Sequence, residues 1–254
     1  MKKSEGELIR YTTYHLTVKD RIQYGAIGLG LAALIARTMY NSLPVFLLLG
    51  PAAAFFLPVF MKPKLKKARL DRLSVRFREA IGILSGYISA GSSVENAFAS
   101  ATGELEKLFG KRADITAEFS GISMLVRLNR PVGDALQDFA DRSGLQDIQN
   151  FAEVFIIAGK TGGSLREIIE RTATVLREKM AVAEEIVNMT ASRRYEQKVM
   201  NVIPFFIILY LDITSPGFLD VMYTTLLGRL VMTGCLAMIA AAYILSNKLL
   251  EIKV

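Results

Sequence analysis

Two long apolar blocks on either side of a charged middle constrain the fold of this chain more than any other feature. The chain of 254 residues carries 31 lysines and arginines and 24 aspartates and glutamates. Residues 23–61 contain only one of these charges (Arg37), and residues 199–247 contain three (Asp212, Asp220 and Arg229). Such segregation argues against an ordinary soluble globule, and so much apolar surface excludes a long disordered chain.

Four segments in the apolar blocks approach the length of about 20 mainly apolar residues that a membrane-spanning helix needs. They are Tyr24–Tyr40, Leu43–Met61, Val199–Ser215 and Leu230–Ser246. A tight turn is predicted around residues 41–44, so the first two spans form a helical hairpin. The third span contains Pro204, which a membrane helix tolerates as a kink because neighbouring helices satisfy the freed backbone groups.

The distribution of lysine and arginine predicts the orientation in the membrane. Residues 62–78 contain eight basic side chains and one acidic side chain, directly after the second span, whereas residues 212–228 contain no basic side chain. We therefore expect a multi-pass protein of the cell (inner) membrane with its middle and both termini in the cytoplasm. The residues predicted to set topology and to contact anionic lipid headgroups are Lys62, Lys64, Lys66, Lys67 and Arg69. Nucleic-acid binding is not expected, because the basic cluster lacks interleaved aromatic side chains.

The predicted fold class is all-α, with four transmembrane helices flanking a cytoplasmic antiparallel helical bundle. The predicted domains are an N-terminal cytoplasmic tail (1–23), a transmembrane hairpin (24–61), the bundle (62–198), a transmembrane pair (199–247) and a C-terminal cytoplasmic tail (248–254).

Helices are predicted through the charged middle from a 3.6-residue apolar period. One face of the first helix consists of Leu73, Phe77, Ala80, Ile81, Leu84 and Ile88. A second helix is predicted to begin after a cap at Ser92, three residues before Glu95. A third is predicted for residues 114–128, because the residue before Pro131 disfavours helix. Shorter helices are predicted near 133–142 and 145–158.

One pattern recurs along the bundle: a turn of small residues, and then a helix that opens with an apolar residue and an acidic residue. The turn positions are Gly91, Gly133, Gly162 and Gly163. Residues 159–163 are predicted to break the chain, and Ser164 to cap a long helix that continues into the third span. From spacing alone, this recurrence is equally well explained by a shared way of starting helices.

The sequence offers no constellation for catalysis, and we expect neither an enzyme nor a bound cofactor or metal. One cysteine (Cys235) and one histidine (His15) leave no disulfide and no metal cluster. A phosphate loop at residues 159–161 would need a glycine where Val154 stands. The charges Arg37, Asp212 and Arg229 fall near the predicted outer span ends, where they can reach the interface, pair with each other or serve a function.

Three blocks carry a resemblance to a known family. They are LSGYISAGSSVENAFASA (84–101), FIIAGKTGGSLREIIERTATVLREKMAVAEEI (155–186) and the stretch from ASRRYEQKVMNVIPFF to the last span (191–242). In order and spacing they resemble the F-domain family of type II secretion systems, and the chain is similar to the single-domain inner-membrane platform proteins of Tad (Flp) type IV pilus systems.

The resemblance implies a platform function, in which a cytoplasmic hexameric secretion ATPase drives the extraction and assembly of pilin or pseudopilin subunits. It also implies pairing with a second platform subunit, either an identical copy or a paralogue. We hypothesise that the long helix from Ser164 towards Pro204 passes motion into the membrane. Small residues in the first span (Gly28, Ala32 and Ala36) permit close packing with the second span or with a pilin helix. The alternative functions are a transporter or channel subunit and a passive membrane scaffold.

Overall fold

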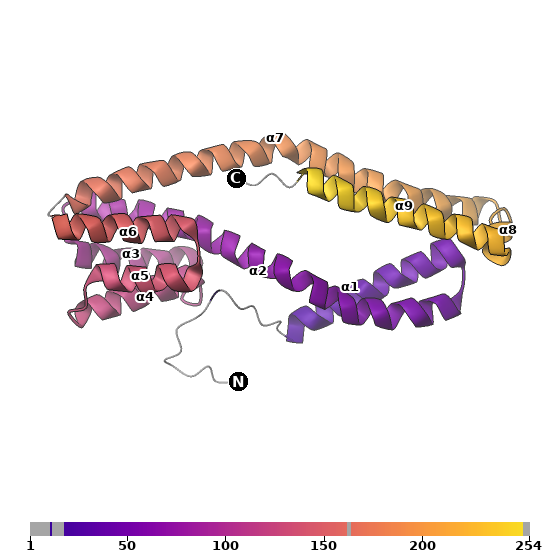
Figure 1. Cartoon of the computed structure of the whole chain (residues 1–254), viewed down its shortest axis with the longest axis horizontal. Helices are drawn as coiled ribbons and strands as arrows, with labels where there is room; N and C mark the ends of the chain where they lie inside the picture. Colours follow the sequence, from indigo (N-terminus) through magenta and orange to yellow (C-terminus); the bar gives the residue numbers. More distant parts are fainter. Residues whose placement is uncertain (1–10, 12–17, 162–163, 251–254) are drawn as a thin grey trace. The chain divides into compact units, whose positions relative to one another are not determined.

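The computed structural model describes Tyr11, residues 18–161 and residues 164–250 (Figure 1). Every regular element in this part of the chain is a helix, which confirms the predicted all-α class. The elements are α1 (Val18–Ile35), the π-helix η1 (Ala36–Tyr40), α2 (Leu43–Ser89), α3 (Val94–Phe109), α4 (Asp114–Arg127), α5 (Val132–Ser143), α6 (Gln146–Thr161), α7 (Leu165–Thr214), α8 (Asp220–Thr224) and α9 (Leu226–Leu250).

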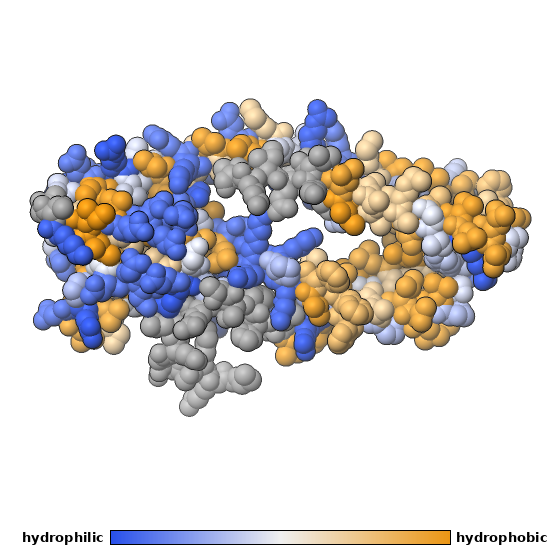
Figure 2. Space-filling view, viewed as in Figure 1, coloured by the Kyte–Doolittle hydropathy of each residue, from blue (hydrophilic) through white to orange (hydrophobic). Residues whose placement is uncertain are grey.

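The chain divides into two compact units. We call residues 1–15 and 63–182 the bundle unit, and residues 16–62 and 183–254 the span unit. Helices α2 and α7 each contribute residues to both units. Figure 2 shows hydrophobic side chains gathered over the span unit and mainly hydrophilic ones over the bundle unit.

Four helices are long and apolar enough to cross a membrane, which confirms the four predicted spans. They are Val18–Tyr40, Leu43–Ser89, Leu165–Thr214 and Leu226–Ser246. Two of them are far longer than a bilayer requires: α2 has 47 residues and α7 has 50. At 1.5 Å per residue these helices are about 70 and 75 Å long, against a hydrocarbon core of about 30 Å.

Helix α2 carries the second span and the first predicted bundle helix as one continuous element. The helix runs without a break through Pro63 and the basic residues that follow it. Lysine and arginine are good helix formers, so a change from apolar to basic composition does not by itself end a helix. The continuity of α7 from the bundle into the third span was predicted and is confirmed.

The core of the bundle unit contains the predicted apolar face of its first helix. Each of Leu73, Phe77, Ala80, Ile81, Leu84 and Ile88 is at most 3% exposed. Aromatic rings from other helices close around this face: the ring centre of Phe77 lies 6.2 Å from that of Phe139 and 5.8 Å from that of Phe151, both edge to face. Burying such a side chain contributes about 1.5–3 kcal/mol to folding.

The ends of the bundle helices follow local signals, with one correction at α3. Its cap is Ser93, not Ser92, and the Ser93 hydroxyl accepts a hydrogen bond from the Asn96 N–H at 3.4 Å. Helix α4 ends as predicted, because Asn129 turns left-handed (φ 57°) and the next N–H closes back onto Leu125 at 3.0 Å.

The end of α6 and the start of α7 can be compared with the predicted break at residues 159–163 and the predicted cap at Ser164. The Ser164 hydroxyl accepts the N–H of Glu167 at 3.3 Å, which confirms Ser164 as the cap of the long helix. Residues 159–161 belong to α6, so the predicted break does not begin at Gly159. The predicted turn residues Gly162 and Gly163 lie outside the described residues.

The first two spans pack closely at Gly28 of α1. A Cβ added to Gly28 would lie 2.9 Å from the backbone oxygen of Ala53 in α2. Ala32 and Ala36 are 4% and 2% exposed. The small residues of the first span therefore serve packing within the chain, and they are not left open for a pilin helix.

Candidate functional site

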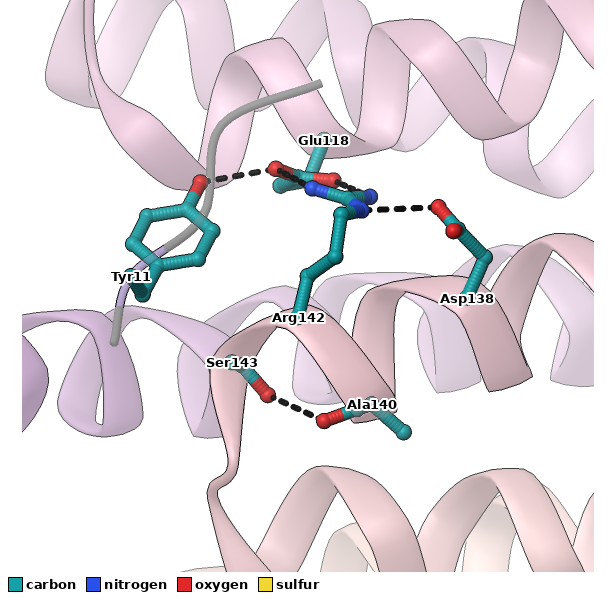
Figure 3. Close-up of polar contacts among 6 residues, drawn as sticks. All are labelled: Tyr11, Glu118, Asp138, Ala140, Arg142 and Ser143. Atoms are coloured by element: carbon teal, nitrogen blue, oxygen red, sulfur yellow. Dashed lines mark hydrogen bonds and ion pairs between the residues drawn. The ribbon is translucent and has the colours of Figure 1, made fainter. Parts of the chain in front are cut away.

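A nearly buried ion pair joins α4 to α5 inside the bundle unit (Figure 3). The Arg142 guanidinium donates two hydrogen bonds to the Glu118 carboxylate, at 2.7 and 2.6 Å, and a third to Asp138 at 2.8 Å. The side chains of Arg142 and Glu118 are 11% and 8% exposed. A fork-to-fork pair of this kind fixes the relative orientation of two helices, because both oxygens and both nitrogens must stay in register.

Tyr11 contacts both members of this ion pair. Its hydroxyl donates to Glu118 Oε1 at 2.7 Å, and its backbone N–H donates to the Arg142 carbonyl at 3.2 Å. The Arg69 guanidinium lies over the ring, 5.0 Å from its centre, and only 2% of Tyr11 is exposed. Figure 3 shows the phenol pointing at the carboxylate from the side opposite Asp138. A residue 107 positions away in the sequence thus completes the surroundings of Glu118.

The titration behaviour of the network keeps its charges in place. Burial and the neighbouring Glu118 carboxylate raise the pKa of Tyr11 well above its ordinary value, so the phenol remains a donor. Burial lowers the pKa of Arg142, but the hydrogen bonds from this guanidinium to Glu118 and Asp138 outweigh burial and hold the pKa above its ordinary value. Neither group changes charge near neutral pH.

Arg69 was predicted to contact lipid, and the structure places it in the bundle instead. Its guanidinium forms a bidentate pair with Asp114 at the start of α4, at 2.8 and 2.7 Å, and it also covers the ring of Tyr11. The pair holds α2 against α4, and a negative charge in the first turn of α4 also favours the helix dipole. The lysines of the same cluster lie on α2, where Lys62, Lys64 and Lys67 are exposed and Lys66 is half-buried; their contact with lipid stays a prediction.

A second network joins α2, α6 and α7. The Asp147 carboxylate accepts from Arg78 Nε at 2.9 Å and from Lys179 Nζ at 2.9 Å. Burial raises the pKa of Asp147, but the hydrogen bonds from Lys179 and Arg78 outweigh burial, so the pKa lies below its ordinary value. Asp147 is therefore ionised throughout the physiological pH range.

Next to this network lies a groove of about 380 Å³ between α6 and α7. It is lined by Asp147, Asn150, Phe151 and Val154 from α6 and by Ile168, Arg171, Thr172, Val175, Leu176 and Lys179 from α7. Five of the ten lining residues are apolar, and the other five are polar or charged.

The structure places the predicted turn glycines differently from one another. Gly91 lies in the turn between α2 and α3 with φ +93°, a conformation that strongly favours glycine. Gly133 lies inside the first turn of α5 and not in the turn before it, which corrects the prediction. A Cβ at Gly133 would lie 2.9 Å from Cγ1 of Ile156, so this glycine permits α5 to approach α6.

In the span unit, the charges predicted near the span ends take part in polar contacts. Arg37 lies 3.1 Å from the Asp212 carboxylate and donates to the Asn41 side chain. Arg229 Nε donates to the carbonyl of Tyr223 at 2.9 Å, and the Tyr223 hydroxyl donates to the carbonyl of Thr38 at 3.0 Å. Pairing between charges was one of the open alternatives, and Arg37 and Asp212 adopt it.

The polar groups described above satisfy one another. In the described part of the chain, every buried side-chain nitrogen or oxygen has a hydrogen-bond partner. The same part of the chain contains no cluster of three or more histidine, cysteine, aspartate or glutamate side chains that could hold a metal ion. Pro204 lies within α7, which continues helical on both sides of it.

Comparison with known proteins identifies a family. The family model described as "Type II secretion system (T2SS), protein F" matches residues 80–211, slightly more than half of the chain. The match extends from the first bundle helix almost to the end of α7. Neither the curated proteins nor the solved structures contain a significant match.

Proposed function

The chain belongs to the family of type II secretion system protein F, and on that premise we propose that it is the inner-membrane platform subunit of a Tad/Flp-like type IV pilus or of a type II secretion machine. It couples a cytoplasmic secretion ATPase to the extraction and assembly of pilin or pseudopilin subunits. It works together with a second platform subunit, and it performs no covalent chemistry. Its bundle lies in the cytoplasm, as do both termini.

One observation carries this proposal: a single helix connects the bundle core to a candidate span. At its beginning, α7 buries Ile169, Ala173 and Leu176 in the bundle. Its last third contains the apolar stretch around Pro204, and no break interrupts the 50 residues between Leu165 and Thr214. A continuous helix of about 75 Å transmits an axial or rotational displacement better than a flexible linker, because each residue is hydrogen-bonded to the next turn.

The networks of the bundle unit support the same function. Displacement reaches α7 only if the bundle moves as one body when a partner acts on it. In addition to the common apolar core, Glu118–Arg142 ties α4 to α5, Arg69–Asp114 ties α2 to α4, and Arg78–Asp147 ties α2 to α6. The bundle is therefore built to receive force on its surface and to pass it to the helices that leave it.

A break in the exposed middle of α7 tests the proposal. Ala191 is exposed, and replacing it with proline removes a helix hydrogen bond and costs about 3 kcal/mol locally. Ala191→Gly costs only about 1 kcal/mol and serves as the matched control. We expect Ala191→Pro to reach the membrane and bind the ATPase at normal levels while pilus or substrate output falls at least tenfold. Ala191→Gly should retain most of the output.

Two results would count against the proposal. Normal output from Ala191→Pro at a normal protein level would show that α7 does not transmit the displacement. Failure of the full-length wild-type chain to bind the secretion ATPase of the same organism would remove the partner altogether. The substitution Pro204→Ala tests the kink separately: if flexure at Pro204 is needed, output falls while insertion is unchanged.

A further inference from the structure

The groove between α6 and α7 is a surface that the packing of the bundle leaves unfilled (helices labelled in Figure 1). Its floor is formed by Phe151 and Leu176, which are 1% and 4% exposed. Its walls carry Val154 and Val175, which are 42% and 45% exposed. Apolar side chains that are exposed together along a groove favour a partner with a complementary apolar face.

The shape of the groove fits a helix better than a compact ligand. Ile168, Thr172 and Val175 follow one another along α7 at spacings of three and four residues. The lining of the groove therefore extends over roughly two to three helical turns, about 10–16 Å. An amphipathic helix lays its anchors into such a groove at the same spacing.

The charges around the groove determine the chemistry of the partner. Arg171 is exposed at the edge and has no acidic partner in the described part of the chain. Asp147 is neutralised by two cations, Arg78 and Lys179, and Lys179 remains half exposed. The groove and the ion pairs that border it thus carry a net positive charge, which is complementary to carboxylates on a partner.

We propose that the groove is the docking site for an amphipathic helix of the cytoplasmic ATPase. The apolar face of that helix fills the space above Phe151 and Leu176. Carboxylates beside the apolar face pair with Arg171 and Lys179. This rests on the proposed function and adds to it the surface of the bundle on which the ATPase acts. The helix α7, which forms one wall, is also the helix that leaves the bundle for the third span. A partner seated there acts directly on α7.

The test is a binding measurement with the full-length chain in detergent and the purified secretion ATPase of the same organism. Val175→Asp places a charge in the groove wall, and we expect the dissociation constant to rise at least tenfold. Arg171→Glu reverses an exposed charge without touching the core, and we expect a three- to tenfold rise with a weaker dependence on salt.

Matched controls are available in the same unit, away from the groove. Leu108 of α3 is 58% exposed and Arg112 lies exposed in the turn after α3. Leu108→Asp and Arg112→Glu repeat the two chemical changes and should leave the dissociation constant within twofold of the wild type. Far-ultraviolet circular dichroism of all four variants shows whether the helices are intact, and Arg171→Glu keeps the test valid if Val175→Asp unfolds.

The outcomes separate the docking site from the function. If the wild type binds the ATPase and both groove variants bind it equally well, the docking site is wrong and the proposed function stands. If the groove variants instead change the oligomeric state, the groove receives a second copy of the chain and the docking site is wrong. If the wild type does not bind the ATPase, the proposed function fails and the docking site fails with it.

Discussion

Loss of the Arg142 guanidinium is the perturbation whose effect follows most directly from the geometry of the bundle. Arg142→Met preserves much of the side-chain volume but removes two hydrogen bonds to Glu118 and one to Asp138. It leaves the Glu118 carboxylate, whose side chain is 8% exposed, with the hydrogen bond from the Tyr11 hydroxyl. Removing one member of a buried ion pair costs about 3–5 kcal/mol, because the other charge stays buried.

Hydrogen–deuterium exchange of the full-length chain in detergent measures this cost. Amides in α4 and α5 that exchange through opening of the bundle should exchange about 10²- to 10⁴-fold faster in Arg142→Met, since each 1.36 kcal/mol corresponds to a factor of ten. The control is Lys111→Met, which breaks the pair of Lys111 with Glu106 at 2.9 Å. The Lys111 side chain is 85% exposed, and a surface pair of this kind contributes at most about 1 kcal/mol.

A double variant separates the cost of an unpaired charge from the loss of packing. Glu118→Gln removes the charge that Arg142→Met leaves behind, so the double variant should recover at least a factor of ten in exchange protection. If Arg142→Met exchanges within threefold of Lys111→Met, or if the double variant exchanges faster than Arg142→Met, the pair does not hold α4 to α5 as described.

Three further predictions concern packing and pH. Gly133→Ala should destabilise the bundle by about 1–3 kcal/mol, because its Cβ would lie 2.9 Å from a side chain of α6. Gly121→Ala, where a Cβ would meet open space, should stabilise it by up to about 1 kcal/mol. Thermal unfolding of the two variants measures both effects. The lowered pKa of Asp147 adds stability above the ordinary aspartate pKa of about 3.9, and this stability is lost as the pH falls through the lowered value. The gap in melting temperature between wild type and Asp147→Asn should therefore be wide at pH 7, begin to narrow below about pH 4, and vanish once the pH is below the lowered pKa. A gap independent of pH would contradict the ion pairs. Gly28→Leu should lower the melting temperature in detergent more than Gly30→Leu, because only Gly28 faces a backbone at 2.9 Å, and equal effects would disprove that contact.

Local and periodic signals predicted most of the fold. The four spans are visible as apolar length, and the face from Leu73 to Ile88 is visible as a 3.6-residue period. The stop of α4 before Pro131 and the cap at Ser164 depend on a few neighbouring residues. The cap of α3 is Ser93, one residue after the predicted Ser92: two serines stand side by side, and the capping-box spacing to Glu95 pointed to the first of them.

The candidate site could not be predicted in the same way, because its partners are far apart in the sequence. Nothing near Tyr11 indicates that its hydroxyl binds a carboxylate 107 positions away. Arg69 belongs to a basic cluster that membrane topology alone could account for, so the sequence did not indicate its pair with Asp114. Gly133 was interpreted as a turn residue because glycine often permits a turn, whereas here it permits a close approach of two helices.

The sidedness of the bundle is the central claim, and labelling of single cysteines tests it most directly. Cys235 is first replaced by alanine, and two single-cysteine variants are then made from that chain. One has cysteine in place of Leu108 in the bundle unit, and the other has cysteine in place of Phe218 after α7. Leu108 and Phe218 are 58% and 67% exposed. In cells with an intact inner membrane, an impermeant maleimide should label position 218 and should reach position 108 only after the membrane is opened. Labelling of position 108 in intact cells would place the bundle outside the cytoplasm, beyond the reach of any cytoplasmic ATPase.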